Sequence, residues 1–137
     1  MLTDVESVSF KELEKFRSDT RREGVRLRDC KGAMWYCIRS DGEIVSFYCL
    51  AVATASATFR CNYTVPAFRR HGCLRRFINH AKRKCLELGI SNMTVFCSPM
   101  SYKSHLREGA EIVRTRGDIR IMKYTSALRW GYQGEIQ

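Results

Sequence analysis

The feature that most limits how this chain can fold is a basic turn between two different hydrophobic patterns. The turn, residues 65 to 74, reads Val-Pro-Ala-Phe-Arg-Arg-His-Gly-Cys-Leu. The run before it, residues 58 to 65, is strand-like, whereas the apolar residues after it recur at the spacing of an amphipathic helix. Such a turn leaves several backbone N–H groups free at the helix start, where the helix dipole adds partial positive charge. Arg69 and Arg70 add charge-assisted donors, so the segment predicts an anion site suited above all to phosphate.

The helix after the turn is predicted over residues 72 to 88, with Gly89 as its C-cap. Its apolar face is expected to contain Leu74, Phe77, Ile78, Ala81, Cys85 and Leu88. Its basic face is expected to contain Arg75, Arg76, Asn79, Lys82 and Arg83. A helix of this kind packs one face on a core and leaves the other in water.

The other elements follow from similar patterns, with turns at Ser40-Asp41-Gly42-Glu43 and Gly117-Asp118. Three consecutive strands before the basic turn imply an antiparallel meander. The predicted elements are a helix over residues 9–23, strands over 33–39, 44–55 and 58–65, the helix over 72–88, a strand over 93–97, a helix over 101–108, and a hairpin of 111–116 with 119–124. The sequence thus predicts an α/β (α+β) protein.

The 137 residues suffice for one domain with a real core, which we expect over residues 1–125. Residues 126–137 read as a C-terminal tail that Trp130 and Tyr132 could dock. No apolar run approaches the roughly 20 residues of a membrane span, and the acidic N-terminus lacks the apolar region of a signal peptide. We therefore expect a cytoplasmic protein that does not enter a membrane.

The net charge of +10 is unevenly distributed, because residues 44 to 86 contain no Asp or Glu. A field of one sign attracts anions. It would suit a phosphorylated cofactor, a nucleic acid or an acidic protein. The basic residues of this stretch are Arg60, Arg69, Arg70, Arg75, Arg76, Lys82, Arg83 and Lys84.

Seven cysteines are present, and six of them follow one another every twelve residues from Cys37 to Cys97. The residues around them do not repeat, so the period does not indicate a structural repeat. Most lie in apolar patterns, which predicts reduced cysteines in the core. No Cys-x-x-Cys pair occurs, and His71 and His80 lack a second ligand at helical spacing, so we expect no metal site.

The basic turn resembles the pyrophosphate-binding motif of the GNAT family of acyl-CoA N-acyltransferases. Pro66, Phe68, Arg69 and Gly72 stand at the offsets that the family uses, whereas Leu74 replaces a small residue. The order of elements is also similar, with residues 5–9 as a weak first strand. The resemblance covers residues 5–125 and implies a mixed, mostly antiparallel sheet of six to seven strands flanked by three to four helices.

The resemblance implies an acyl-CoA cofactor, most simply acetyl-CoA, between two strands that splay apart. Its pantetheine arm would pair with the backbone of Tyr63, Thr64 and Val65. The phosphates would lie on the turn, and two serines after residue 97 match cofactor-binding positions. The cofactor residues expected in the turn and beyond it are Arg69, Arg70, His71, Gly72, Cys73, Leu74, Ser98 and Ser101. Cys73 is either a reactive thiol at a helix start or, with more weight, a buried filler.

Catalysis in the family commonly uses a glutamate before the turn as base, and this chain has none there. A water chain, a histidine, Glu108 or Glu111, or an acceptor that is already neutral would have to replace it. In many family members a tyrosine donates the proton that the departing thiolate needs. The resemblance places His105 at the position of this tyrosine, four residues before Gly109. Tyr102 lies one helical turn earlier and could substitute for His105.

Three functions are consistent with these features. The first is transfer of an acetyl group to an amine on an acidic or macromolecular acceptor, since the basic field would repel a polyamine. The second is modification of a DNA base, by analogy with phage proteins that resemble the family. The third is a basic nucleic-acid-binding module with a degenerate cofactor pocket, in which Phe59, Tyr63 and Phe68 would stack on bases. Many family members dimerise, so a homodimer is also consistent.

Overall fold

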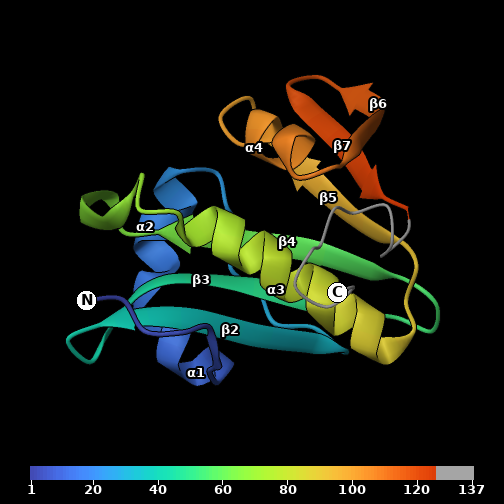
Figure 1. The fold of residues 1–137 in the computed structure, drawn as a ribbon. Helices are drawn as coiled ribbons and strands as arrows, with labels where there is room; N and C mark the ends of the chain where they lie inside the picture. Colours follow the sequence, from blue (N-terminus) through green and yellow to red (C-terminus); the bar gives the residue numbers. More distant parts are fainter. Residues whose placement is uncertain (126–137) are drawn as a thin grey trace.

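A seven-stranded sheet organises the computed structural model, which describes residues 1–125 (Figure 1). The strand order is β1-β2-β3-β4-β5-β7-β6. The predicted tail, residues 126–137, lies outside the described residues. The strands are β1 (Glu6–Ser7), β2 (Ala33–Ser40), β3 (Glu43–Val52), β4 (Ala57–Thr64), β5 (Met93–Cys97), β6 (Glu111–Arg116) and β7 (Ile119–Tyr124). The helices are α1 (Phe10–Leu13), α2 (Arg17–Arg22), α3 (Cys73–Leu88) and α4 (Tyr102–Arg107), with 3₁₀ turns η1 (Glu14–Phe16) and η2 (Pro66–Phe68).

The strand pairs are antiparallel except for β4 and β5, which run parallel. This parallel pairing extends only from Ala57–Met93 to Phe59–Val95. Beyond Phe59, β4 is paired with β3 alone, and Figure 1 shows β5, β6, β7 and α4 turning away from the other strands. The sheet therefore splits between β4 and β5, as the resemblance implied.

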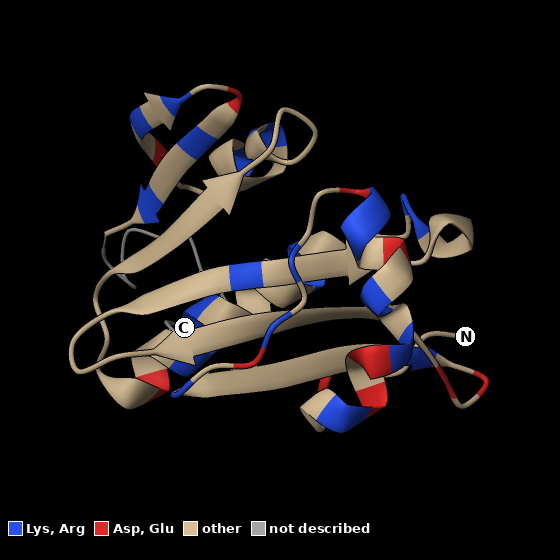
Figure 2. Ribbon diagram, turned by 180° about the vertical axis from the view of Figure 1, so that it is seen from behind, with Lys and Arg blue, Asp and Glu red and all other residues tan. Residues whose placement is uncertain are grey.

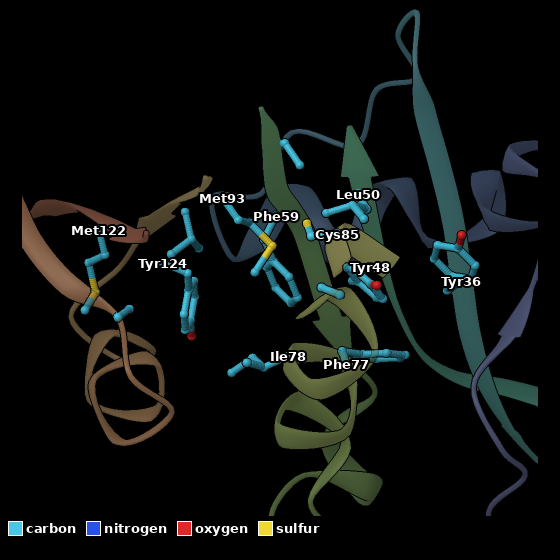
Figure 3. Packing of buried hydrophobic residues seen from close by; sticks show 14 of the residues in the cluster. Tyr36, Tyr48, Leu50, Phe59, Phe77, Ile78, Cys85, Met93, Met122 and Tyr124 are labelled. Atoms are coloured by element: carbon cyan, nitrogen blue, oxygen red, sulfur yellow. The ribbon is translucent and has the colours of Figure 1, made fainter. Parts of the chain in front are cut away.

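Two hydrophobic cores lie on the two faces of the sheet. The larger one joins α3 to β2, β3, β4, β5 and β7; in Figure 3, Phe77 and Ile78 of α3 face Tyr48, Phe59 and Tyr124 of the strands. The smaller one lies under α1 and α2, where Leu13 and Phe16 are buried. Apolar residues on both faces explain why β3 reads as a continuous hydrophobic run rather than an alternating one.

A β-bulge at Cys61 changes the direction in which β4 presents its side chains. Cys61 has a φ of 55°, and the register with β3 shifts between Phe47–Tyr63 and Cys49–Arg60. Phe59 packs in the core under α3, whereas Tyr63 packs in the core under α2. Residues four apart would share a face in a regular strand, so the bulge separates the two ends of β4.

Most predicted elements are confirmed, including the meander, the long helix and the last hairpin with its turn. Four details were wrong. The predicted helix over 9–23 is divided into α1, η1 and α2, and the strand over 44–55 ends at Val52. Lys82, expected on the basic face, is only 2% exposed, because its stem crosses the core and its ammonium group reaches the carbonyl oxygen of Glu108. Leu88, expected in the core, is 52% exposed at the end of α3.

The cysteines behave as the sequence predicts. All seven are free thiols; Cys30 is exposed and Cys61 partly so, and the other five are buried. Among the described residues, no three His, Cys, Asp or Glu side chains form a group that could hold a metal ion. No helix in the described part of the chain is long and apolar enough to cross a membrane.

Candidate functional site

The basic turn between β4 and α3 has a backbone that only specific residues adopt easily. After η2, Arg70 has a φ of 66° and Gly72 a φ of 81°, and α3 begins at Cys73. Glycine accepts this left-handed conformation without strain. An alternation of ordinary and left-handed residues can point successive amide groups toward one side, which is the backbone geometry of many anion-binding turns.

The amide groups of residues 70 to 75 take part in no hydrogen bond within the described part of the chain. The last amide used before them is that of Arg69, which donates to the carbonyl of Pro66 at 3.3 Å. The first one used after them is that of Arg76, which donates to the carbonyl of Gly72 at 3.1 Å. A row of free donors at the start of a 16-residue helix can bind an anionic group such as phosphate.

The side chains of the turn have different tasks. Arg69 donates to Glu23 at 2.5 Å and to the carbonyl of Thr64 at 2.9 Å, so its guanidinium group holds the turn against the end of α2. Arg70 is exposed and takes part in no ion pair among the described residues. The ring of His71 is bonded through Nδ1 to the carbonyl of Arg69 at 2.9 Å. Of the two predicted arginine donors, only Arg70 is left to reach a ligand with its side chain.

Cys73 and Leu74, the first two residues of α3, contribute to the core. Cys73 is buried, and burial raises the pKa of its thiol despite a hydrogen bond with Ser46 that lowers it. It is therefore the buried filler of the two interpretations. Leu74 is half-buried and packs against the core under α3, so its side chain points away from the row of amides. The residue that departs from the family motif thus contributes to the core.

The end of β4 pairs on one side only. Tyr63 and Thr64 pair with Phe47 and Ser46 of β3, and the Val65 amide donates to the carbonyl of Val45 at 2.8 Å. The side toward β5 has no strand partner beyond Phe59. An extended ligand can add to such an edge through backbone hydrogen bonds.

The end of β5 leads into α4 through Ser98 and Ser101, whose hydroxyl groups lie 3.4 Å apart. Ser98 is exposed, and its carbonyl accepts hydrogen bonds from the amides of Ser101 and Tyr102. Tyr102 is half-buried, and the Arg120 guanidinium group lies 3.9 Å from its ring centre. The two serines and Tyr102 thus follow the end of β5, the strand that forms one side of the split.

His105 lies inside the protein rather than on the surface of α4. It is 2% exposed, its Nδ1 lies 2.8 Å from the Tyr124 hydroxyl, and its ring meets Phe59 edge-on. Burial and then the nearby charge of Lys82 lower its pKa to about 4, so the imidazole is neutral at pH 7. Sequence spacing found the position of His105 but not its partner Tyr124, which comes from the last strand.

Two alternative bases that the sequence offered lie at the far side of α4. Glu108 is half-buried and forms an ion pair of 3.6 Å with Arg75, while Glu111 is exposed at the start of β6. Arg60 stood in the sequence only as one of many basic residues. It occupies the first position of β4 beyond the parallel pairing with β5.

Comparison with known proteins identifies the fold. No protein-family model matches the sequence, and no curated protein sequence does. Solved structures do match. One is the PaiA N-acetyltransferase from Thermoplasma acidophilum in complex with coenzyme A, with a TM-score of 0.74 at 12% identity over 91% of this chain and 99% of that one. Another is the ribosomal-protein-S18-alanine N-acetyltransferase from Escherichia coli, with a TM-score of 0.74 at 13% identity over 92% and 94%.

A third similar structure is the N-acetylglutamate synthase from Neisseria gonorrhoeae complexed with coenzyme A and N-acetyl-glutamate. Its TM-score is 0.71 at 12% identity over 92% of this chain and 35% of that one. In these three comparisons the similarity covers 91 to 92% of this chain. The chain therefore has the acyl-CoA N-acyltransferase fold of the GNAT family.

Proposed function

We propose that this protein is an N-acyltransferase that uses an acyl-CoA, most simply acetyl-CoA, and transfers the acyl group to an amine. The observation that carries the proposal is the row of free amides of residues 70 to 75, next to the one-sided end of β4. Amides at a helix start suit a pyrophosphate group, and a one-sided strand suits an extended pantetheine arm. The fold similarity to N-acetyltransferases with bound coenzyme A supports the same cofactor.

Each part of the site has a task in this reaction. The amides of residues 70 to 75 and the Arg70 side chain bind the pyrophosphate. The backbone of Tyr63, Thr64 and Val65 aligns the pantetheine arm along β4, and Ser98 and Ser101 bind it from β5. The bound cofactor supplies a thioester whose carbonyl carbon is attacked by the acceptor amine. The C–S bond then breaks, and the thiolate needs a proton.

We assign the proton donation to Tyr102 rather than to His105. At neutral pH His105 is a neutral imidazole, which is a poor acid, and it is enclosed by the core. Tyr102 is the more accessible of the two predicted donors. His105 instead positions α4, because it ties this helix to Tyr124 of β7. A Tyr102→Phe variant should lose acyl transfer yet retain acetyl-CoA binding.

No carboxylate from residues 44 to 86 can act as the base. Glu108 is engaged with Arg75, and Glu111 lies on the exposed edge strand. We therefore propose that the acceptor amine arrives neutral or loses its proton through water. The acceptor is an acidic molecule or a macromolecule, because the basic field favours anions. A nucleic acid is the second candidate partner, favoured by the charge of +10.

A thermal melt with and without excess acetyl-CoA tests the proposal. A ligand at about 100 times its dissociation constant stabilises a protein by roughly 2.7 kcal/mol, which raises the melting temperature by several degrees. An Arg70→Glu, Gly72→Glu variant should lose this shift. An Arg114→Glu variant, altered on β6 away from the site, should retain it. Absence of a shift with any acyl-CoA in the wild-type protein would contradict the proposed function.

A further inference from the structure

Arg60 lies at the point where the sheet divides. Phe59 and Val95 form the last parallel pair, so Arg60 and Phe96 are the first residues past it on the two diverging strands. Partners in a parallel pair share a face, which places both side chains on the face opposite α3. Phe96 is 57% exposed. Arg60 therefore faces the region that an acceptor must enter to reach a thioester held between β4 and β5.

The guanidinium group of Arg60 is half-buried without a carboxylate partner. Its Nη1 lies 3.4 Å from Cys30 Sγ and 3.7 Å from Cys49 Sγ, and its carbon lies 6.0 Å from the centre of the Trp35 ring. Among the described residues, Arg60 forms no ion pair within 4.0 Å. Burial raises the pKa of the Cys49 thiol to about 12 and also raises that of Cys61, so neither neutralises Arg60 at pH 7.

The segment of residues 25–32 covers this region, and its one acidic side chain, Asp29, already has hydrogen-bond partners. Asp29 accepts hydrogen bonds from Trp35 Nε1 at 2.9 Å and from the Cys30 amide at 3.0 Å. Figure 2 shows the segment after α2 crossing in front of β4 and β3 on this face. It is held there by the Cys61 thiol, which donates to the Arg26 carbonyl at 3.3 Å.

The same segment brings further positive charge to Arg60. Arg26 and Arg28 are both exposed, and the charge of Arg28 acts on the Cys61 thiol next to Arg60. The segment is also fixed at its far end: the Val52 amide donates to the carbonyl of Gly32 at 2.9 Å. A Cβ at Gly32 would lie 2.3 Å from the Val52 carbonyl oxygen, so only glycine permits this approach. The contact between Gly32 and Val52 thus helps to hold the segment that carries Arg26 and Arg28 near Arg60.

We propose that Arg60 binds a carboxylate or phosphate group of the acceptor, so that the substrate class is an amine that carries an anion close to its reacting nitrogen. This inference rests on the proposed acyltransferase function. The planar guanidinium group can meet either anion through two parallel hydrogen bonds. The contact would replace weak thiol acceptors with a full negative charge, and it would fix the amine at the opening between β4 and β5.

The test measures how strongly anions stabilise the protein. Saturating coenzyme A is present, so that the amides of residues 70 to 75 are occupied. Melting temperature is followed against sodium phosphate and, separately, sodium succinate at constant ionic strength. The proteins are wild type, Arg60→Met, which keeps an apolar stem on Trp35, Arg60→Lys, which keeps the charge, and Arg114→Met as the matched control. The two anions separate a phosphate from a carboxylate as the natural group.

We expect Arg60→Met to weaken binding of at least one anion by roughly tenfold or more, and Arg60→Lys to weaken it less. The control should bind as the wild type does. Equal anion affinity in wild type and Arg60→Met overturns the inference, as does an equal loss in Arg114→Met. If Arg60→Met does not fold, Arg60→Gln takes its place under the same criteria. If coenzyme A itself does not raise the melting temperature, the proposed function is contradicted. The dependence of anion affinity on Arg60 is then measured in the absence of coenzyme A.

Discussion

Two histidines, the half-buried His80 and the buried His105, are held in their neutral form at pH 7. Burial is the largest cause in both, and it lowers each pKa to about 4. Nearby cations add to the effect: Arg83 and Lys84 beside His80, and Lys82 beside His105. Each ring bonds through Nδ1 to a tyrosine hydroxyl at 2.8 Å. These pairs link α3 to β3 and α4 to β7, so their protonation state bears on stability.

Acid should therefore destabilise the protein as the pH falls below about 6.5. An unfolded histidine binds a proton below a pH of about 6.5, whereas folded His105 binds one only near pH 4. The free energy of unfolding consequently falls as the pH drops from 6.5 toward 4, by on the order of 3 kcal/mol for His105. Urea unfolding at several pH values measures this slope. His105→Gln should reduce this slope, and the part that remains is expected from His80.

Under the proposed function, the start of α3 is the part of the chain on which cofactor binding depends. Gly72 has a φ of 81°, and a Cβ there would meet no atom within 4 Å. Gly72→Ala is therefore strained by its backbone rather than by a clash, at a cost of about 1 kcal/mol. The added methyl group would also stand beside the row of amides.

Gly24 offers a matched control, because it has a φ of 77° and equally open surroundings, at the end of α2. We expect Gly72→Ala and Gly24→Ala to lower the free energy of unfolding by similar amounts. Only Gly72→Ala should weaken acetyl-CoA binding, as measured by isothermal titration calorimetry. Unchanged affinity in Gly72→Ala would show that the phosphates do not approach this residue.

The net charge of the molecule makes salt dependence a test that distinguishes nucleic-acid binding from acetyl-CoA binding. A nucleic acid bound through six to ten phosphates would lose roughly a thousandfold or more in affinity between 50 and 200 mM salt. A cofactor held mainly by backbone amides and a helix dipole depends on salt much less, and we expect a loss of only a few-fold for acetyl-CoA. Titrations at both salt concentrations make the comparison. A steep salt dependence for acetyl-CoA would argue against the pocket described above.

What the sequence determined by itself is local. The strand, turn and helix around Pro66 and Gly72, and the last hairpin at Gly117, follow from hydrophobic period and from residues whose backbone preferences act within a few positions. The long helix was accordingly predicted to within a residue at its start. The N-terminal helix was predicted too long, because tertiary contacts of Leu13 and Phe16 break it into pieces that follow the sheet.

The tertiary structure decided which of many similar side chains matter. Lys82 and Arg83 look alike in the sequence, yet Arg83 is exposed, whereas Lys82 is buried and meets the Glu108 carbonyl and the Tyr124 ring, which lie far along the chain. His105 is neutral because the strand that ends at Tyr124 closes over it. Arg60 forms no ion pair among the described residues, and the Asp29 carboxylate in the segment across this face is bonded instead to Trp35 and the Cys30 amide. The burial and the charge pairing of a side chain depend on residues that are far away in the sequence, so no local sequence pattern could reveal them.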